Sequence, residues 1–314
     1  MNPHLTLNLV ADVRQLLAYR FMVNALQAAS VVAVMAAVVG WFMVLRRETF
    51  AGHTLSVMSF PGAAAAALAG LPLAVGYFVF CVAGAALIAA ASGEPRRPAA
   101  RARVGVHGHG GRAQQPAVIG AVQAGAFAVG FLLLSIYGGV LESLETLLFG
   151  SILGVTRGQV LTLAIVALCT LAFLGVVGRP LFFASVDRSL ARASRVPVRS
   201  LASAFLIALA LAVAATAQIT GVLLVFALLV APAAIARELT ARVGLGLALS
   251  VLLGLLIAWV GLGLSYFTNY PSGFFVTSVA LVLFAGARAA RALLAVRRRR
   301  AHGGPPTLAG AVSG

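Results

Sequence analysis

Lysine is absent from this 314-residue sequence, and acidic residues are scarce. All 23 basic residues are therefore arginines, and they are accompanied by seven aspartates and glutamates. Charged residues make up 10% of the chain, whereas soluble domains usually contain about a quarter. A phosphate-binding loop of the Walker type requires Gly-Lys-Ser/Thr, which a chain without lysine does not supply. We therefore expect no ATPase site of that type in this chain.

Cysteine and catalytic motifs are also scarce. Cys81 and Cys169 each lie inside an apolar segment, which is typical of packing and not of a disulfide framework or a zinc knuckle. The patterns His-Glu-x-x-His and Gly-x-Ser-x-Gly do not occur, so two common hydrolase signatures are missing. The apolar segments contain few polar side chains that could converge as catalysts. The sequence thus argues against an enzyme.

Hydrophobic residues, by contrast, make up 61% of the chain, and the mean hydropathy is +1.04. They form runs of about 20 residues, the length of a membrane-spanning helix. Residues 200–236 would make one helix about 55 Å long, so we divide them near Gln218 and Gly221 into two short spans or a broken helix. The sequence predicts an all-α integral membrane protein, a polytopic helical bundle of about nine transmembrane helices. The predicted spans are 21–45, 53–70, 71–91, 117–137, 159–178, two within 200–236, 243–265 and 273–295.

Arginine placement predicts the orientation of these spans. With the N-terminus outside and the C-terminus cytoplasmic, 20 of the 23 arginines lie inside, as the positive-inside rule expects. Their location in short links also argues against nucleic-acid binding. The sequence then divides into an amphipathic interfacial segment (1–20), a transmembrane permease domain (21–296) with cytoplasmic links 92–116 and 179–199, and a basic, then disordered, cytoplasmic tail (297–314).

Four motifs follow one another in the order of a known family. Residues 50–62 read FAGHTLSVMSFPG, 148–155 read LFGSILGV, 220–234 read TGVLLVFALLVAPAA, and 270–273 read YPSG. Together they resemble the zinc/manganese/iron ABC transporter permeases of the ABC-3 type. The resemblance extends over roughly 21–290, and it implies a protein of the bacterial cell membrane.

The resemblance also implies partners. It predicts a second copy of the chain, cytoplasmic ABC ATPase subunits and an external metal-binding protein, all within membrane lipid. Segment 185–197 resembles the cytoplasmic coupling helix on which the ATPase acts, although a basic interfacial helix is the plainer alternative. The residues expected to contact the ATPase are Asp187, Leu190, Ala191, Ala193 and Pro197.

The metal route departs from the family pattern. That pattern reads Phe-x-Gly-Asp-x-x-Ser-His, and here His53 takes the place of the aspartate and Val57 that of the histidine. We interpret His53 as a transient metal ligand, against the alternative of a neutral polar residue near a helix start. Glu142 and Glu145 lie three residues apart in an external link and are weaker candidates for attracting a cation. The pair His107 and His109 closes no coordination shell.

The sequence therefore predicts a transporter subunit that moves a divalent cation, zinc or manganese, through a homodimer interface. No permanently bound cofactor is expected, since the metal is the cargo. A permease for a metal chelate such as cobalamin or a siderophore is the first alternative. A membrane scaffold or an intramembrane enzyme is the second.

Overall fold

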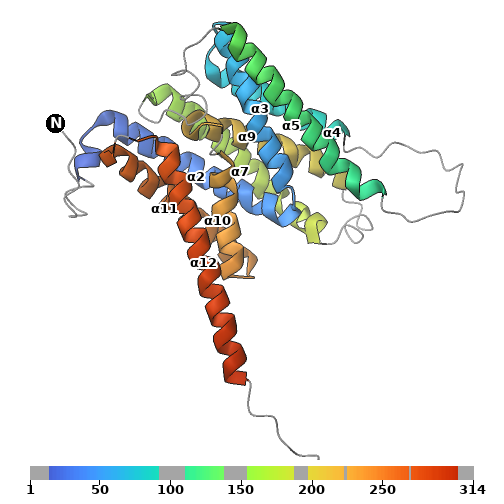
Figure 1. The fold of residues 1–314 in the computed structure, drawn as a ribbon, viewed down its shortest axis with the longest axis vertical. Helices are drawn as coiled ribbons and strands as arrows, with labels where there is room; N and C mark the ends of the chain where they lie inside the picture. The colour runs from blue at the N-terminus through green and yellow to red at the C-terminus, as the bar shows by residue number, and fades with distance from the viewer. Residues whose placement is uncertain are drawn as a thin grey trace, which may run out of the picture.

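The structure is a computed structural model, and it describes residues 14–91, 110–137, 154–186, 197–222, 225–268 and 270–302. The regular secondary structure in these ranges is helical throughout (Figure 1). The helices are α2 (Arg20–Arg46), α3 (Thr49–Leu68), α4 (Leu73–Ala91), α5 (Gly110–Tyr137), α7 (Arg157–Val186), α9 (Val198–Thr220), α10 (Val225–Leu239), α11 (Val243–Thr268) and α12 (Ser272–His302). The predicted fold class, an all-α polytopic bundle, is confirmed.

Seven of the described helices are long and apolar enough to cross a membrane. The two others are α3, which contains His53 and several hydroxyl side chains, and α10, which has 15 residues. The number of crossings and the sides on which the termini lie therefore stay predictions.

Helix α2 is the most enclosed of these candidate spans. Its neighbours are α7, α9, α10 and α11, and 67% of its apolar window is buried. Small residues make this possible because they let helix backbones approach closely where lipid provides no hydrophobic drive for association. At Gly40, a Cβ atom would overlap the backbone oxygen of Leu229 on α10.

A second group of helices forms around α3. This helix packs against α4 and α5 and touches α10, and α4 in turn packs against α9. Figure 1 shows α3, α4 and α5 together, away from α12. Gly62 and Gly76 meet where α3 and α4 cross, and a Cβ on either one would overlap the other's carbonyl oxygen. The buried hydroxyl groups of α3 are thus held inside protein.

Several helix ends differ from the predicted spans. Helix α7 continues to Val186, into the predicted basic link 179–199, and α12 continues to His302, past the predicted start of the tail. Arginine is a good helix former, so the basic run near the end of α12 does not end that helix. The division of 200–236 is confirmed, since α9 ends at Thr220 and α10 begins at Val225.

Candidate functional site

Most polar side chains of α3 are bonded to their own helix. The buried hydroxyl of Thr54 donates to the Phe50 carbonyl oxygen at 3.1 Å, and that of Ser56 donates to the His53 carbonyl oxygen at 2.7 Å. Such bonds satisfy a hydroxyl where no water is available. Among these α3 side chains, His53 differs because part of its hydrogen-bonding capacity is unused.

His53 lies in the second turn of α3 and is half-buried. Its Nδ1 atom is buried and has no hydrogen-bond partner among the described residues. The ring meets Phe226 of α10 edge-on, with the ring centroids 5.0 Å apart. A neutral imidazole can offer one nitrogen lone pair to a donor or to a metal ion, and leaving a buried polar group unpaired costs about 1–3 kcal/mol. His53 therefore has an unsatisfied nitrogen at the contact between α3 and α10.

A second ligand is missing from the next turn of α3. Val57 is four residues beyond His53, on the same face of the helix, and it is buried with 3% exposure. In the described part of the chain, no group of three or more His, Cys, Asp or Glu side chains could hold a metal ion. Transition-metal sites usually have three or four such ligands. His53 alone therefore falls short of the number of ligands that such a site usually has.

The start of α3 is fixed by an ion pair that the sequence did not indicate. Arg46, the last residue of α2, donates from its η2 and ε nitrogens to Oε1 of Glu48 at 2.7 and 3.1 Å. The Arg46 side chain is 6% exposed and its guanidinium lies 5.0 Å above the ring centre of Phe205 on α9. Arg47 between them has φ 60°, which turns the chain back. The pair holds the α2–α3 corner, and hence His53, against α9.

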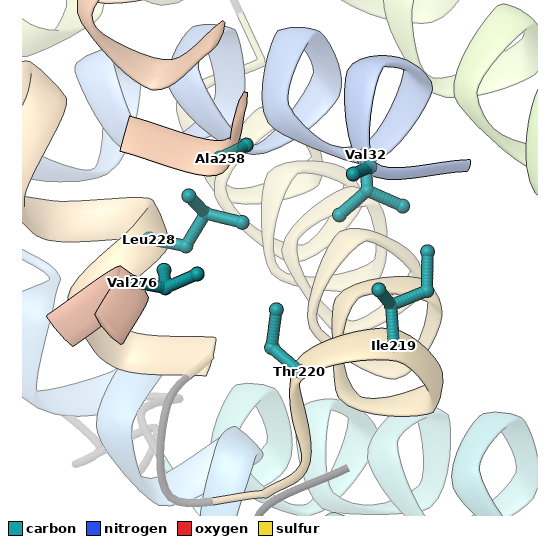
Figure 2. A pocket seen from close by; sticks show the side chains of 7 residues that line it. Val32, Ile219, Thr220, Leu228, Ala258 and Val276 are labelled. Carbon is teal, nitrogen blue, oxygen red and sulfur yellow. The ribbon is translucent and has the colours of Figure 1, made fainter. Parts of the chain in front are cut away.

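The joint between α9 and α10 lies beside a small cavity (Figure 2). Gly221 has φ 74° and ψ 164°, a conformation that is essentially restricted to glycine. The cavity has a volume of about 10 Å³, roughly enough for one water molecule. It is lined by Ala29, Val32, Ile219, Thr220, Leu228, Ala258 and Val276.

The polar residues beside this joint are satisfied locally. The hydroxyl of Thr220 donates to the Thr216 carbonyl oxygen at 3.1 Å, and the Gln218 amide donates to the Ala214 carbonyl oxygen at 3.4 Å. The cavity therefore offers a cation no free polar side chain of α9. We treat it as a packing defect at the joint and not as a binding site.

Most of the other predicted site residues lie outside the described residues. These are Glu142, Glu145, His107, His109, Asp187, Leu190, Ala191 and Ala193. Pro197 is described, and it precedes α9 as its N-terminal capping residue, exposed at the surface. The predicted contact of these residues with an ATPase therefore stays a prediction.

Seven of the described helices are long and apolar enough to cross a membrane, and several hydroxyl groups of α3 are buried between helices. These features define a class of protein, the multi-pass membrane proteins in which polar groups face the bundle interior. Residues 18–290 match the model of the ABC 3 transport family. The chain belongs to this family, as the motifs predicted, and it is an ABC transporter permease of the bacterial cell membrane.

Individual relatives extend over most of the chain. It is 29% identical to the manganese transport system membrane protein MntC of Halalkalibacterium halodurans, over 88% of this chain and 90% of that protein. It is 28% identical to a probable iron transport system membrane protein of Haemophilus influenzae, over 82% and 89%. Among solved structures, PsaBC from Streptococcus pneumoniae in complex with Fab superposes with a TM-score of 0.74 and 25% identity, over 88% of this chain and 94% of that one.

A more distant structure shares the fold. An inward-facing conformation of a putative metal-chelate type ABC transporter has a TM-score of 0.69 and 18% identity, and 92% of both chains is covered. At that identity the likeness concerns the arrangement of helices alone.

Proposed function

We propose that this chain is the channel-forming permease subunit of an importer for a divalent transition-metal cation, manganese or zinc. The observation that carries the proposal is the buried, unpartnered Nδ1 of His53, at the position where the family pattern has an aspartate. Relatives named for manganese and iron transport support a metal cargo. Imidazole suits zinc and iron, whereas carboxylates suit manganese, so the exchange of ligand favours zinc.

The proposed assembly is a homodimer. One imidazole per chain is too few for a coordination shell, and two copies of His53 facing each other across a symmetry axis would double the ligand number. Weak coordination also suits a conduction route, because the ion has to leave the site again. Separate cytoplasmic ATPases would drive the cycle, and an external binding protein would deliver the ion.

Metal accumulation in cells tests this function. Cells lacking the chain are compared with cells that express it or His53→Ala, and manganese, zinc and iron are each quantified. We expect the deletion to lower accumulation of one of the metals. His53→Ala should lower it at least about tenfold at equal protein abundance, since loss even of a residue that only supports a metal ligand typically costs about that much. The matched control is Thr162→Ala on α7, whose exposed hydroxyl bonds to its own helix.

The double variant His53→Asp with Val57→His restores the family's ligand pair and should recover transport. Unchanged accumulation in His53→Ala would remove His53 from the route. A deletion that changes none of the three metals would refute the proposed function itself.

A chelate is the second candidate cargo. The favouring observation is Val57, a buried apolar side chain where the family's second ligand is expected. A chelated ion brings its own ligands and needs no coordination shell from the helix. A relative 27% identical is the chelated iron transport system membrane protein YfeC of Yersinia pestis. Uptake of a radiolabelled iron chelate that survives in His53→Ala would favour this reading over the first.

A further inference from the structure

Aromatic side chains mark one membrane boundary near the start of α12. Tyr19 lies 6.3 Å from Tyr266, measured between ring centroids, and joins the end of α11 to the start of α2. Tyr270 and Phe274 are 67% and 60% exposed. Tyrosines at the ends of neighbouring spans are typical of the aromatic belt at the headgroup level. The hydrocarbon core therefore begins close to Ser272.

Helix α12 is too long to end at the opposite boundary. Its 31 residues measure about 46 Å at 1.5 Å per residue, while the hydrocarbon core is about 30 Å thick. About 20 residues cross the core, so the helix leaves it near Arg291. In Figure 1 the C-terminal end of α12 extends beyond the other labelled helices.

The part of α12 that leaves the core is strongly basic. Arg288 and Arg291 are exposed, and Arg291 forms an ion pair with Glu238 of α10. The same helix then carries residues 297–300, four consecutive arginines. Successive helix positions differ by about 100°, so these four positions surround the helix axis. The sequence thus assigns a basic residue to every side of the helix axis at this level.

The chain itself offers little charge to balance these arginines. No aspartate or glutamate occurs in the sequence after Glu238, and Glu238 is paired with Arg291. The complementary charge therefore has to come from outside this part of the chain. The nearest source of negative charge at this depth is the layer of anionic lipid headgroups, which lies within about one Debye length of the core boundary.

We propose that the C-terminal end of α12, residues 288–300, binds anionic phospholipid headgroups and thereby fixes the depth of the bundle in the membrane. Clusters of four to eight basic residues directly beyond a membrane span are typical of such binding, and each arginine strengthens it about fivefold. This binding is independent of which cargo the transporter carries.

The test uses the full chain in lipid nanodiscs. An environment-sensitive fluorophore is attached at Ala301→Cys, in a Cys169→Ser background, and the neutral quencher acrylamide reports its access to water. Phosphatidylglycerol is titrated into phosphatidylcholine. We expect phosphatidylglycerol to protect the label, and salt to remove the protection. The variant with glutamine at 297–300 should need at least ten times more phosphatidylglycerol for equal protection.

The matched control replaces Arg14, Arg20 and Arg157 with glutamine, because these exposed arginines are assigned to the opposite boundary. It should keep the wild-type titration. Equal protection in pure phosphatidylcholine, or an unchanged titration in the 297–300 variant, overturns the proposal. So does protection that appears only when the purified ATPase subunit is added, since the basic end would then be a protein-docking surface.

Discussion

Helices α2 and α7 are almost equally apolar but have different surroundings. Their best windows have mean hydropathies of 2.4 and 2.7, yet 67% of the first and 22% of the second is buried inside the chain. On α2, buried positions such as Ala25, Ala29 and Ala33 are small, whereas on α7, Leu161, Leu168 and Val176 are large and exposed. Hydropathy therefore identifies a span but does not show whether protein or lipid surrounds it, and small residues such as those of α2 allow the closer approach of neighbouring helices.

The largest expected effect comes from filling the space beside one glycine on each helix. Gly40→Ala on α2 puts a methyl group into the backbone of Leu229, which cannot move aside, and we expect a loss of about 3 kcal/mol. Gly175→Ala on α7 has nothing within 4 Å and should gain up to about 1 kcal/mol of helix propensity. Reversible unfolding in mixed micelles measures the change in stability of each variant. Equal changes would contradict the difference in packing between α2 and α7.

The second prediction contrasts two ion pairs. Glu48→Ala leaves the Arg46 guanidinium, which is 6% exposed, without its carboxylate partner. We expect the free energy of unfolding to fall by about 2–3 kcal/mol. This is less than the full cost of breaking a buried pair, because Glu48 itself is 21% exposed. Glu238→Ala frees Arg291, which is 61% exposed, and should cost less than about 1 kcal/mol. The same unfolding assay compares them. A larger loss for Glu238→Ala would show that the α2–α3 corner is not held by its ion pair.

The third prediction concerns two glycines with positive φ. Gly221→Ala forces a side chain into a conformation with φ 74° and ψ 164°, in the buried joint near α2, and should cost about 2 kcal/mol. Gly70→Asn places a tolerant residue at φ 66° in an exposed turn with open space around it, so its cost should be below about 1 kcal/mol. Thermal inactivation of the two purified variants shows which of them is less stable. A lower stability of Gly70→Asn would contradict the strained conformation of Gly221 between α9 and α10.

The smallest effect distinguishes a bond between helices from one within a helix. The buried hydroxyl of Ser250 on α11 donates to the Ala37 carbonyl oxygen of α2 at 3.1 Å, and Ser250→Ala should cost about 0.6 kcal/mol. Thr162→Ala on α7 loses a bond to the Gly158 carbonyl oxygen of its own helix and should be near neutral. Reversible unfolding resolves this difference, and equal losses would remove Ser250 as a tie between helices.

The sequence predicts the fold well because the lipid leaves few choices. Apolar runs of fixed length must be helices, and the length of 200–236 together with Gly221 predicts the break that the structure has. Helices α7 and α12 extend beyond the predicted spans, because a span ends where the lipid ends and a helix need not. Charge determines where a helix leaves the lipid, while the backbone remains helical as long as its propensity and hydrogen bonds allow.

The candidate site is harder to predict from the sequence than the fold. The family pattern identifies His53, but its edge contact with Phe226 joins two helices far apart in the chain. The pair of Arg46 and Glu48 was missed for a different reason. Residues two apart do not face each other on a helix, and they meet here because Arg47 adopts φ 60°, which an arginine rarely does.

The break between α9 and α10 also has an electrical consequence. A helix carries about half an elementary negative charge at its C-terminal end and half a positive charge at its N-terminal end. Since α9 stops at Thr220 and α10 starts at Val225, one end of each dipole lies inside the bundle. One continuous helix would place both poles near water, where they are screened. The interruption thus gives the protein interior a permanent local field that no ionised side chain has to provide.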